Sequence, residues 1–294
     1  ILKPYWVLLV IATIVAVSFA QDIAQHFEVS EGLIREAQEH LEPRITGGVT
    51  AMPHEFPYQV GLYIENIREV EGELTTVYTW CGGSIISKNY IVTAAHCLRT
   101  AIAAVVFVGA QNIQRKEVDR KLIGVSYKDF TIHESYDDQV SINDIALIKL
   151  PEEIKFSKAA KPINLPRRSQ DDSKIIGRLA TASGWGRTGD KGATSDVLRF
   201  AHLRVLKPAK CEDIYDFLFT NSNLCVDGSS HKSVCPGDSG GPLAIDELDG
   251  NMTLIGLTSF GHKKGCEVGL PTAFTRVASY VDWIQKHTGI PAKP

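Results

Sequence analysis

The sequence predicts an all-β fold, and two features of its pattern support that prediction. Short apolar or alternating runs recur through most of the chain, and Gly, Pro, Asn and Asp separate them. The clearest runs cover residues 59–64, 84–86, 104–108 and 145–150. Runs of this length, broken by turn residues, are typical of strands in a β-sandwich or β-barrel. A chain of 294 residues can build one large domain or two modest ones of this kind.

Charge and cysteine content narrow the functional classes. The net charge is −3 and the two signs are interspersed, so no basic patch is suited to nucleic acid or to a membrane surface. The six cysteines include no C-x-x-C pair, which argues against a zinc site and favours disulfides formed in an oxidising compartment. Their spacing alone leaves the pairing open.

The first 20 residues are typical of a signal peptide. Lys3 precedes an apolar stretch from residue 5 to residue 20, and the small residues Ser18 and Ala20 suit a signal-peptidase site. The stretch is shorter than the ~20 apolar residues that a membrane span needs. We therefore expect a secreted, extracellular protein with no membrane anchor.

Residues 21–44 have a different character, being polar, charged and free of cysteine. Leu33, Ile34, Ala37 and Leu41 are spaced as on one face of a helix, so part of this segment is expected to be an amphipathic helix. A solvated linker is the alternative.

The strongest candidate for chemistry is the motif CPGDSGGP at residues 235–242. A serine hydroxyl becomes a good nucleophile only when a base takes its proton and hydrogen-bond donors await the oxyanion. The glycines around Ser239 let the backbone turn tightly, so the N–H groups of Gly237 and Ser239 can point at one substrate oxygen. Taken alone, the motif could equally be a glycine-rich hairpin loop.

Two other segments supply the groups that such a serine lacks. The motif TAAHC at residues 93–97 places His96 after an apolar run, and NDIAL at residues 143–147 places Asp144 before another. Alone, a histidine beside a cysteine is more often structural or a metal ligand, and an aspartate before a strand is usually a turn residue. Together, in the order His96, Asp144, Ser239, the three motifs resemble the chymotrypsin family of serine proteases.

The resemblance covers the chain from residue 45 to about residue 290 and looks closest to arthropod chymotrypsins and crustacean collagenolytic proteases. It implies two antiparallel Greek-key β-barrels, a C-terminal α-helix and an active site in the cleft between the barrels. The implied ranges are about 45–161 for the first barrel, about 162–279 for the second and about 278–287 for the helix. The implied disulfides are Cys81–Cys97, Cys211–Cys225 and Cys235–Cys266.

The resemblance also implies the chemistry of a serine endopeptidase. Ser239 would attack the scissile carbonyl while His96 takes its proton, and Asp144 would orient the imidazole. The amides of Gly237 and Ser239 would hold the oxyanion. No metal or organic cofactor is implied. Some family members hold calcium in a loop whose first acidic ligand is matched here by Ala110, so we expect no metal site.

The motif PRITGG at residues 43–48 resembles the family's activation site, with Thr46 in place of the usual valine. Cleavage after Arg44 would free the amine of Ile45. That amine would pair with Asp238 and order the oxyanion loop, a buried ion pair that acts as a switch. The implied segments are a signal peptide (1–20), an activation propeptide (21–44) and a peptidase domain (45–294). No cysteine tethers the propeptide, so we expect it to leave after cleavage.

The residues that match the family's specificity pocket predict the preferred substrates. The floor is Ser233, where trypsin-like enzymes have aspartate, so a basic substrate side chain would be buried without a partner. Gly261 leaves the mouth open and Thr272 narrows the base. Ser259 and Phe260, with Gly261, would pair with the substrate backbone as an added strand. We expect cleavage after Phe, Tyr, Leu or Met, and a separate trypsin-like protease as the activator.

Two local features stand apart from this scheme. Residues 65–77 form an acidic insertion in a hairpin that the resemblance places beside the leaving half of the substrate. This hairpin could favour basic residues after the cut bond, or it could be a solvated loop tip that tolerates insertion. Asn251 begins an N-glycosylation sequon on an expected hairpin.

The resemblance sets the expected partners and biology. We expect protein and peptide substrates, the activating protease, proteinaceous serine-protease inhibitors, and a monomer. The lack of an N-terminal cysteine-rich module favours a digestive role. The alternatives are a regulatory protease with the same chemistry, and a non-catalytic homologue that acts as a binding protein.

Overall fold

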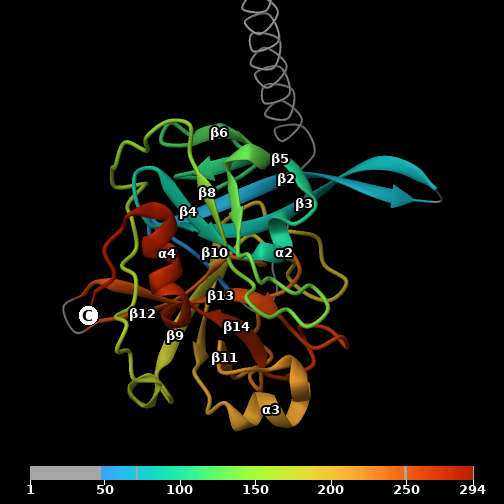
Figure 1. Cartoon of the computed structure of the whole chain (residues 1–294), viewed down its shortest axis with the longest axis vertical. Coiled ribbons are helices and arrows are strands. Elements are labelled where there is room, and N and C mark those ends of the chain that lie inside the picture. Colours follow the sequence, from blue (N-terminus) through green and yellow to red (C-terminus); the bar gives the residue numbers. More distant parts are fainter. Residues whose placement is uncertain (1–47, 71, 248–249, 294) are drawn as a thin grey trace, which may run out of the picture.

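The computed structural model describes residues 48–70, 72–247 and 250–293, which form two curled antiparallel β-sheets (Figure 1). The expected signal peptide, propeptide and cleavage site at Arg44 and Ile45 lie outside the described residues. The all-β prediction is confirmed, since each sheet has seven strands and the helices are short. Within the described part of the chain, no helix is long and apolar enough to cross a membrane.

The first sheet has the strand order β6-β5-β2-β3-β4-β8-β7. Its strands are β2 (Gln59–Val70), β3 (Glu73–Ile85), β4 (Tyr90–Thr93), β5 (Ala101–Val108), β6 (Lys121–Ser126), β7 (Phe130–Ile132) and β8 (Ala146–Lys149). Side chains alternate between the two faces of a strand, so Val60, Leu62 and Ile64 of β2 all enter one core cluster. That alternation is what the sequence pattern of residues 59–64 predicts.

The second sheet has the order β1-β10-β9-β12-β13-β14-β11. Its strands are β1 (Val49–Thr50), β9 (Leu179–Gly184), β10 (Arg199–Arg204), β11 (Asn223–Val226), β12 (Pro242–Asp246), β13 (Met252–Phe260) and β14 (Thr272–Arg276). Strand β1 pairs with β10. The first described residues of the range expected for barrel 1 therefore lie on the second sheet.

The helices lie around the sheets. They are α2 (Ala95–Leu98), α3 (Ala209–Tyr215) and α4 (Val281–Thr288), with 3₁₀ turns η1 (Tyr127–Asp129), η2 (Asp172–Lys174), η3 (Asp216–Leu218) and η4 (Val277–Tyr280). The helix expected at residues 278–287 thus begins as the 3₁₀ turn η4 and becomes α-helical at Val281. It ends at Gly289, whose φ of 74° is the left-handed conformation that glycine adopts at helix ends.

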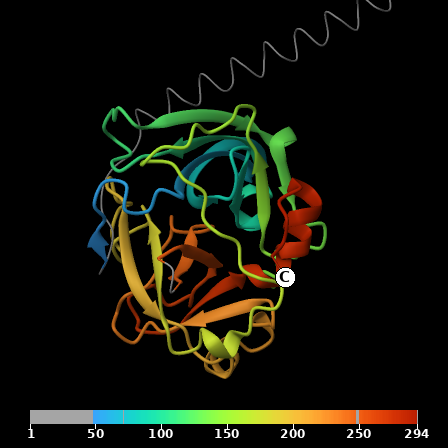
Figure 2. The same cartoon turned by 90° about the vertical axis from the view of Figure 1, so that its left-hand side faces the viewer.

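Helix α4 packs against the first sheet although it follows the second (Figure 2). The Trp283 ring lies 5.2 Å from that of His133, which follows β7. The Trp283 Nε1–H donates to Glu134 Oε2 at 2.7 Å. The end of the chain therefore ties the two sheets together.

The largest core cluster joins the two sheets. Trp80 of β3 packs its ring edge-on against Trp185, which follows β9, with ring centroids 6.1 Å apart. Trp185 is fully buried, and Phe107 of β5 and Leu257 of β13 belong to the same cluster. Burial of aromatic and aliphatic side chains between the sheets fixes their relative position.

Three disulfides join segments of the described chain, at the pairings that the family resemblance implies. Cys81–Cys97 joins β3 to α2, Cys211–Cys225 joins α3 to β11, and Cys235–Cys266 joins two loops of the second sheet. No cysteine in the described residues is free.

Candidate active site

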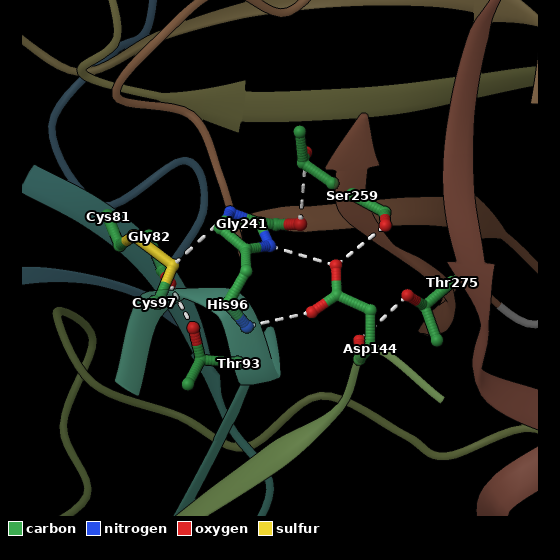
Figure 3. Close-up of polar contacts among 10 residues, drawn as sticks. Cys81, Gly82, Thr93, His96, Cys97, Asp144, Gly241, Ser259 and Thr275 are labelled. Atoms are coloured by element: carbon green, nitrogen blue, oxygen red, sulfur yellow. Dashed lines mark hydrogen bonds and ion pairs between the residues drawn. A yellow bond between two sulfur atoms is a disulfide. The ribbon is translucent and has the colours of Figure 1, made fainter. Parts of the chain in front are cut away.

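Strand pairing brings His96 and Asp144 together. Strands β4 and β8 are antiparallel, with Thr93 opposite Ala146. His96 follows Thr93 on the one-turn helix α2, and Asp144 comes just before β8. The Asp144 carboxylate accepts two hydrogen bonds from His96, one from its backbone N–H at 2.9 Å and one from Nδ1 at 2.8 Å (Figure 3).

The second sheet completes the surroundings of Asp144. The Ser259 hydroxyl, on β13, donates to Asp144 Oδ2 at 2.6 Å, and the Thr275 hydroxyl, on β14, donates to the Asp144 carbonyl at 2.8 Å (Figure 3). Asp144 is 1% exposed. A buried carboxylate needs such donors because burial removes its water.

These contacts set the charges of the pair. Burial raises the pKa of Asp144, but the charge of His96 and the hydrogen bonds from His96 and Ser259 outweigh it, so the pKa is lowered. Burial lowers the pKa of His96, but the charge and hydrogen bond of Asp144 outweigh it, so the pKa is raised above 6.5. The arrangement leaves Asp144 ionised and makes His96 a stronger base.

The loop that carries Ser239 is bonded to both sheets. The Ser239 carbonyl accepts a hydrogen bond from Gly82 N–H of β3 at 2.7 Å, and Gly240 N–H donates to the carbonyl of Thr258 on β13 at 2.8 Å. A methyl group added to Gly240 would lie 2.9 Å from the amide nitrogen of Ala94, two residues before His96. The loop of Ser239 and the segment that leads into His96 are thus in direct contact.

The backbone of this loop is shaped by glycine and by a buried carboxylate. Gly237 has a φ of 98°, a conformation that residue types other than glycine rarely adopt. Within the part of the chain that the structure describes, the amides of Gly237 and Ser239 donate to no backbone carbonyl. Between them, Asp238 is 5% exposed and accepts from Gly186 N–H at 2.7 Å and Cys235 N–H at 3.0 Å.

Asp238 has no cationic partner among the described residues. Burial raises its pKa to about 6, although the two backbone donors oppose that effect. A cavity of about 20 Å³ lies beside it, lined also by Gly48 and Arg199. Gly48 is the first residue that the structure describes, so the start of the described chain and the Asp238 carboxylate line the same cavity.

A cavity of about 560 Å³ opens beside Ser239. All five residues expected in the specificity pocket line it: Ser233, Ser259, Phe260, Gly261 and Thr272. The hydroxyls of Ser233 and Thr272 lie 2.9 Å apart and can hydrogen-bond to each other. The two residues expected at the bottom of the pocket therefore lie side by side there, and both are uncharged hydroxyls.

Sequence reasoning missed several residues of this cavity, among them Asp190, Lys263 and Lys264. Asp190 is exposed, and its Oδ1 accepts from the backbone N–H of Cys266 at 2.6 Å. It comes from a loop far from Cys266 in the chain, and this contact holds it at the cavity together with the hydrogen bond from its own backbone N–H to Glu267 Oε2 at 2.8 Å. No motif signals it.

Two remaining expectations concern metal and sugar. Ligand atoms of Cys81, His96 and Cys97 lie within 4.8 Å of one another, but both sulfurs belong to one disulfide and offer no thiolate. Asn251 is exposed directly before β13. Its glycosylation stays a prediction.

Comparisons with known proteins agree with this geometry. The chain matches the model of the Trypsin family over residues 45–284. It is 40% identical to Brachyurin of Leptuca pugilator over 84% of this chain and 99% of that protein. It is 36% identical to Collagenase of Hypoderma lineatum over 96% of this chain and 98% of that protein. It is 35% identical to Chymotrypsin of Phaedon cochleariae over 85% of each.

The solved structures agree as well. A structure described as HL collagenase at 1.7 Å resolution superposes with a TM-score of 0.71 at 35% identity, over 84% of this chain and 100% of that one. The resemblance to arthropod chymotrypsins and collagenolytic proteases is confirmed. The chain belongs to the trypsin family of serine proteases and is a serine endopeptidase.

Proposed function

We propose that Ser239, His96 and Asp144 form the catalytic triad. His96 removes the proton of Ser239 as its Oγ bonds to the scissile carbonyl carbon, and later gives that proton to the leaving amine. Water then cleaves the acyl-enzyme by the same proton transfers in reverse order. The amides of Gly237 and Ser239 stabilise the oxyanion. The His96–Asp144 hydrogen bonds, beside the glycine-rich loop of Ser239, carry this proposal.

The same site prefers to cut after large apolar residues. The base of the cavity carries Ser233 and Thr272, which offer no charge to a lysine or arginine side chain. Asp190 does not replace a charged floor, because it is exposed and its carboxylate is bonded to Cys266 N–H. Phe, Tyr, Leu and Met side chains gain from burial there, while the substrate backbone pairs with the segment from Ser259 to Gly261.

The chain is a zymogen that cleavage after Arg44 activates. The buried Asp238 with a raised pKa is a ready partner for the ammonium group of Ile45. Gly48 lines the same cavity as Asp238, so only three residues would separate a freed Ile45 terminus from that cavity. Pairing there would fix the backbone of Gly237 and Ser239 for oxyanion binding. Because the pocket does not suit arginine, a trypsin-like protease makes the cut.

The expected setting is a secreted digestive enzyme. Three disulfides suit an oxidising, extracellular compartment. Protein substrates and proteinaceous inhibitors are its partners, and it acts as a monomer. A regulatory protease would share this site, whereas a non-catalytic homologue would not need all three triad residues.

The test is a substrate profile of the activated enzyme. The zymogen is cut with trypsin, the new N-terminus is sequenced, and short nitroanilides ending in Phe, Leu, Met, Arg or Asp are compared. Phe, Leu and Met substrates should exceed the Arg substrate by at least about 100-fold in kcat/KM. The Ser239→Ala variant, cut in the same way, is the control and should be inactive.

Two results would count against the proposal. One is an Arg substrate cleaved as fast as the Phe substrate. The other is a cleaved protein whose Ser239 does not react with a serine-directed fluorophosphonate.

A further inference from the structure

The described residues of the acidic insertion, 65–70 and 72–77, belong to a regular β-ribbon. Strands β2 and β3 pair without interruption from Gln59–Ser84 to Val70–Glu73. Strand β5 accompanies β2 only as far as the Asn66–Ala101 pair. Beyond it the two strands project from the body on the side where α2 lies (Figure 1). We call residues 65–70 and 72–78 the ribbon.

Pairing register divides the side chains of the ribbon between two faces. Glu65 lies opposite Tyr78, Ile67 opposite Thr76, and Glu69 opposite Leu74, so these six share one face. We call this the acidic face: Glu65, Ile67, Glu69, Leu74, Thr76 and Tyr78. By the same alternation the opposite face carries Asn66, Arg68, Glu73, Thr75 and Val77.

The two faces differ in chemistry. On the acidic face, Leu74 is 78% exposed, Ile67 41% and Tyr78 37%, and two glutamates flank them. On the opposite face, one arginine and one glutamate balance each other. Exposed apolar side chains grouped with charge of one sign suit a partner segment that is both apolar and basic.

The ribbon is continuous with the proposed active site. Strand β3 runs from the ribbon to Gly82, whose N–H donates to the Ser239 carbonyl. On the other side of Ser239 lies β13, where the substrate segment before the cut bond is proposed to pair. The segment after the cut bond therefore leaves toward β3. At ~3.4 Å per residue, Tyr78 lies about 14 Å and Leu74 about 27 Å along β3 from Gly82.

We propose that the acidic face of the ribbon binds the leaving half of protein substrates. It selects extended segments whose basic and apolar side chains fall about four to eight residues after the cut bond. Short peptides do not reach the acidic face. It therefore affects the preference among proteins and long peptides and leaves the specificity of the pocket unchanged. This inference rests on the proposed function, because only a working protease has a leaving half to hold.

Three substrates separate the inference from the proposed function. A short nitroanilide tests the pocket and triad alone. Two internally quenched peptides share their sequence up to the third residue after the cut and then continue as Lys-Lys-Ile-Ile-Lys or Glu-Glu-Ile-Ile-Glu, so that each face of the extended segment carries both a charged and an apolar side chain. The activated enzyme should cleave the lysine peptide about fivefold better in kcat/KM, and added salt should shrink that ratio.

Matched variants locate the effect on one face. Glu69→Lys and Glu73→Lys change charge equally at neighbouring positions but point to opposite faces. Glu69→Lys should bring the lysine-to-glutamate ratio to about one, whereas Glu73→Lys should leave most of it. Leu74→Ser should lower kcat/KM for both long peptides about threefold through lost apolar contact. The nitroanilide rate should stay the same in all three, which also reports that each variant is folded.

Three outcomes would overturn the inference. Equal rates for the two long peptides show that the ribbon does not read charge. If Glu69→Lys and Glu73→Lys lower the lysine-to-glutamate ratio equally, the preference comes from long-range attraction to the net charge and not from binding to one face. If sedimentation detects a dimer and Leu74→Ser converts it to a monomer, a second copy of the chain occupies the acidic face. If the nitroanilide itself is not cleaved, the proposed function fails instead.

Discussion

At the residue scale, motif recognition predicted the identities of the site residues, and the structure adds their supporting contacts. His96, Asp144 and Ser239 each stand in a distinctive motif, so sequence alone singled them out. Asp190 and the contact between Thr275 and Asp144 could not be predicted. They depend on loops and strands far apart in the chain, and polar residues at such positions look like any surface or strand residue.

The protonation of His96 gives the first prediction in this discussion. In the proposed mechanism His96 must be neutral to accept the Ser239 proton, so kcat/KM for a Phe nitroanilide should fall as pH drops through a pKa above 6.5. Asp144→Asn removes the charge that raises this pKa. The acid limb should then move to lower pH, and kcat should drop on the order of 10⁴-fold, because asparagine no longer holds the imidazole in the correct tautomer.

Thr275→Val is the control for that experiment. It removes the hydrogen bond to the Asp144 carbonyl but leaves the carboxylate and its bonds to His96 in place. We expect kcat to fall by less than about tenfold and the acid limb of the kcat/KM profile to stay at the same pH. An acid limb that stays in place in Asp144→Asn would show that Asp144 does not set the pKa of His96.

At the element scale, the sequence predicted which runs become strands but not where they end. Residues 59–64 form a strand as expected, yet β2 continues to Val70 because its partner β3 begins at Glu73 and pairs with it throughout. The sequence of residues 65–77 is mostly polar and lacks the apolar alternation that is typical of a strand, so its pairing was not predicted. Conversely, the helix expected from residue 278 starts as a 3₁₀ turn, a boundary that helical spacing does not resolve.

The glycine-rich loop of Ser239 gives a prediction at this scale. Gly240 has a φ of 72°, and an added methyl group would lie 2.8 Å from Gly82 O and 2.9 Å from Ala94 N. Gly240→Ala must therefore strain or displace the loop. We expect it to lower the free energy of unfolding by about 3 kcal/mol and to abolish activity. Urea unfolding and active-site labelling measure the two effects.

Gly261→Ala is the matched control. A methyl group at Gly261 meets nothing within 4 Å. Its free energy of unfolding should change by less than about 0.5 kcal/mol. If Gly240→Ala were as stable as Gly261→Ala, the close contact of the Ser239 loop with Gly82 and Ala94 would not exist in solution.

At the scale of the whole molecule, the site depends on two sheets that local sequence cannot orient. Asp144 belongs to the first sheet, but Ser259 and Thr275 of the second hold it, and β1 crosses to pair with β10. Sequence patterns predict strands and their faces, whereas contacts between distant segments follow from the packed interior around residues such as Trp185. Only the family resemblance supplied that arrangement in advance.

The buried Asp238 gives the last prediction, which concerns the stability of the whole chain. Its pKa is about 6 in the folded chain and 3.8 in the unfolded reference. As pH rises, the unfolded chain loses this proton first, so the folded form is at a growing disadvantage. For the uncleaved chain, the free energy of unfolding should fall between about pH 4 and about pH 6, by on the order of 3 kcal/mol, and then level off.

Cleavage after Arg44 should remove that loss, because an Ile45 ammonium group beside Asp238 stabilises the ionised carboxylate and lowers its pKa. Urea unfolding of the Ser239→Ala protein, uncleaved and cleaved, measures the difference without self-digestion. Apart from the Ile45 amine, the titrating groups of residues 45–294 are shared by both forms, whereas those of the propeptide leave with it, so the change of each curve with pH is compared. Between about pH 4 and about pH 6 the uncleaved form should lose stability on the order of 3 kcal/mol, and the cleaved form should not show this loss. Parallel curves would mean that the new terminus does not reach Asp238, and the proposed activation switch would be wrong.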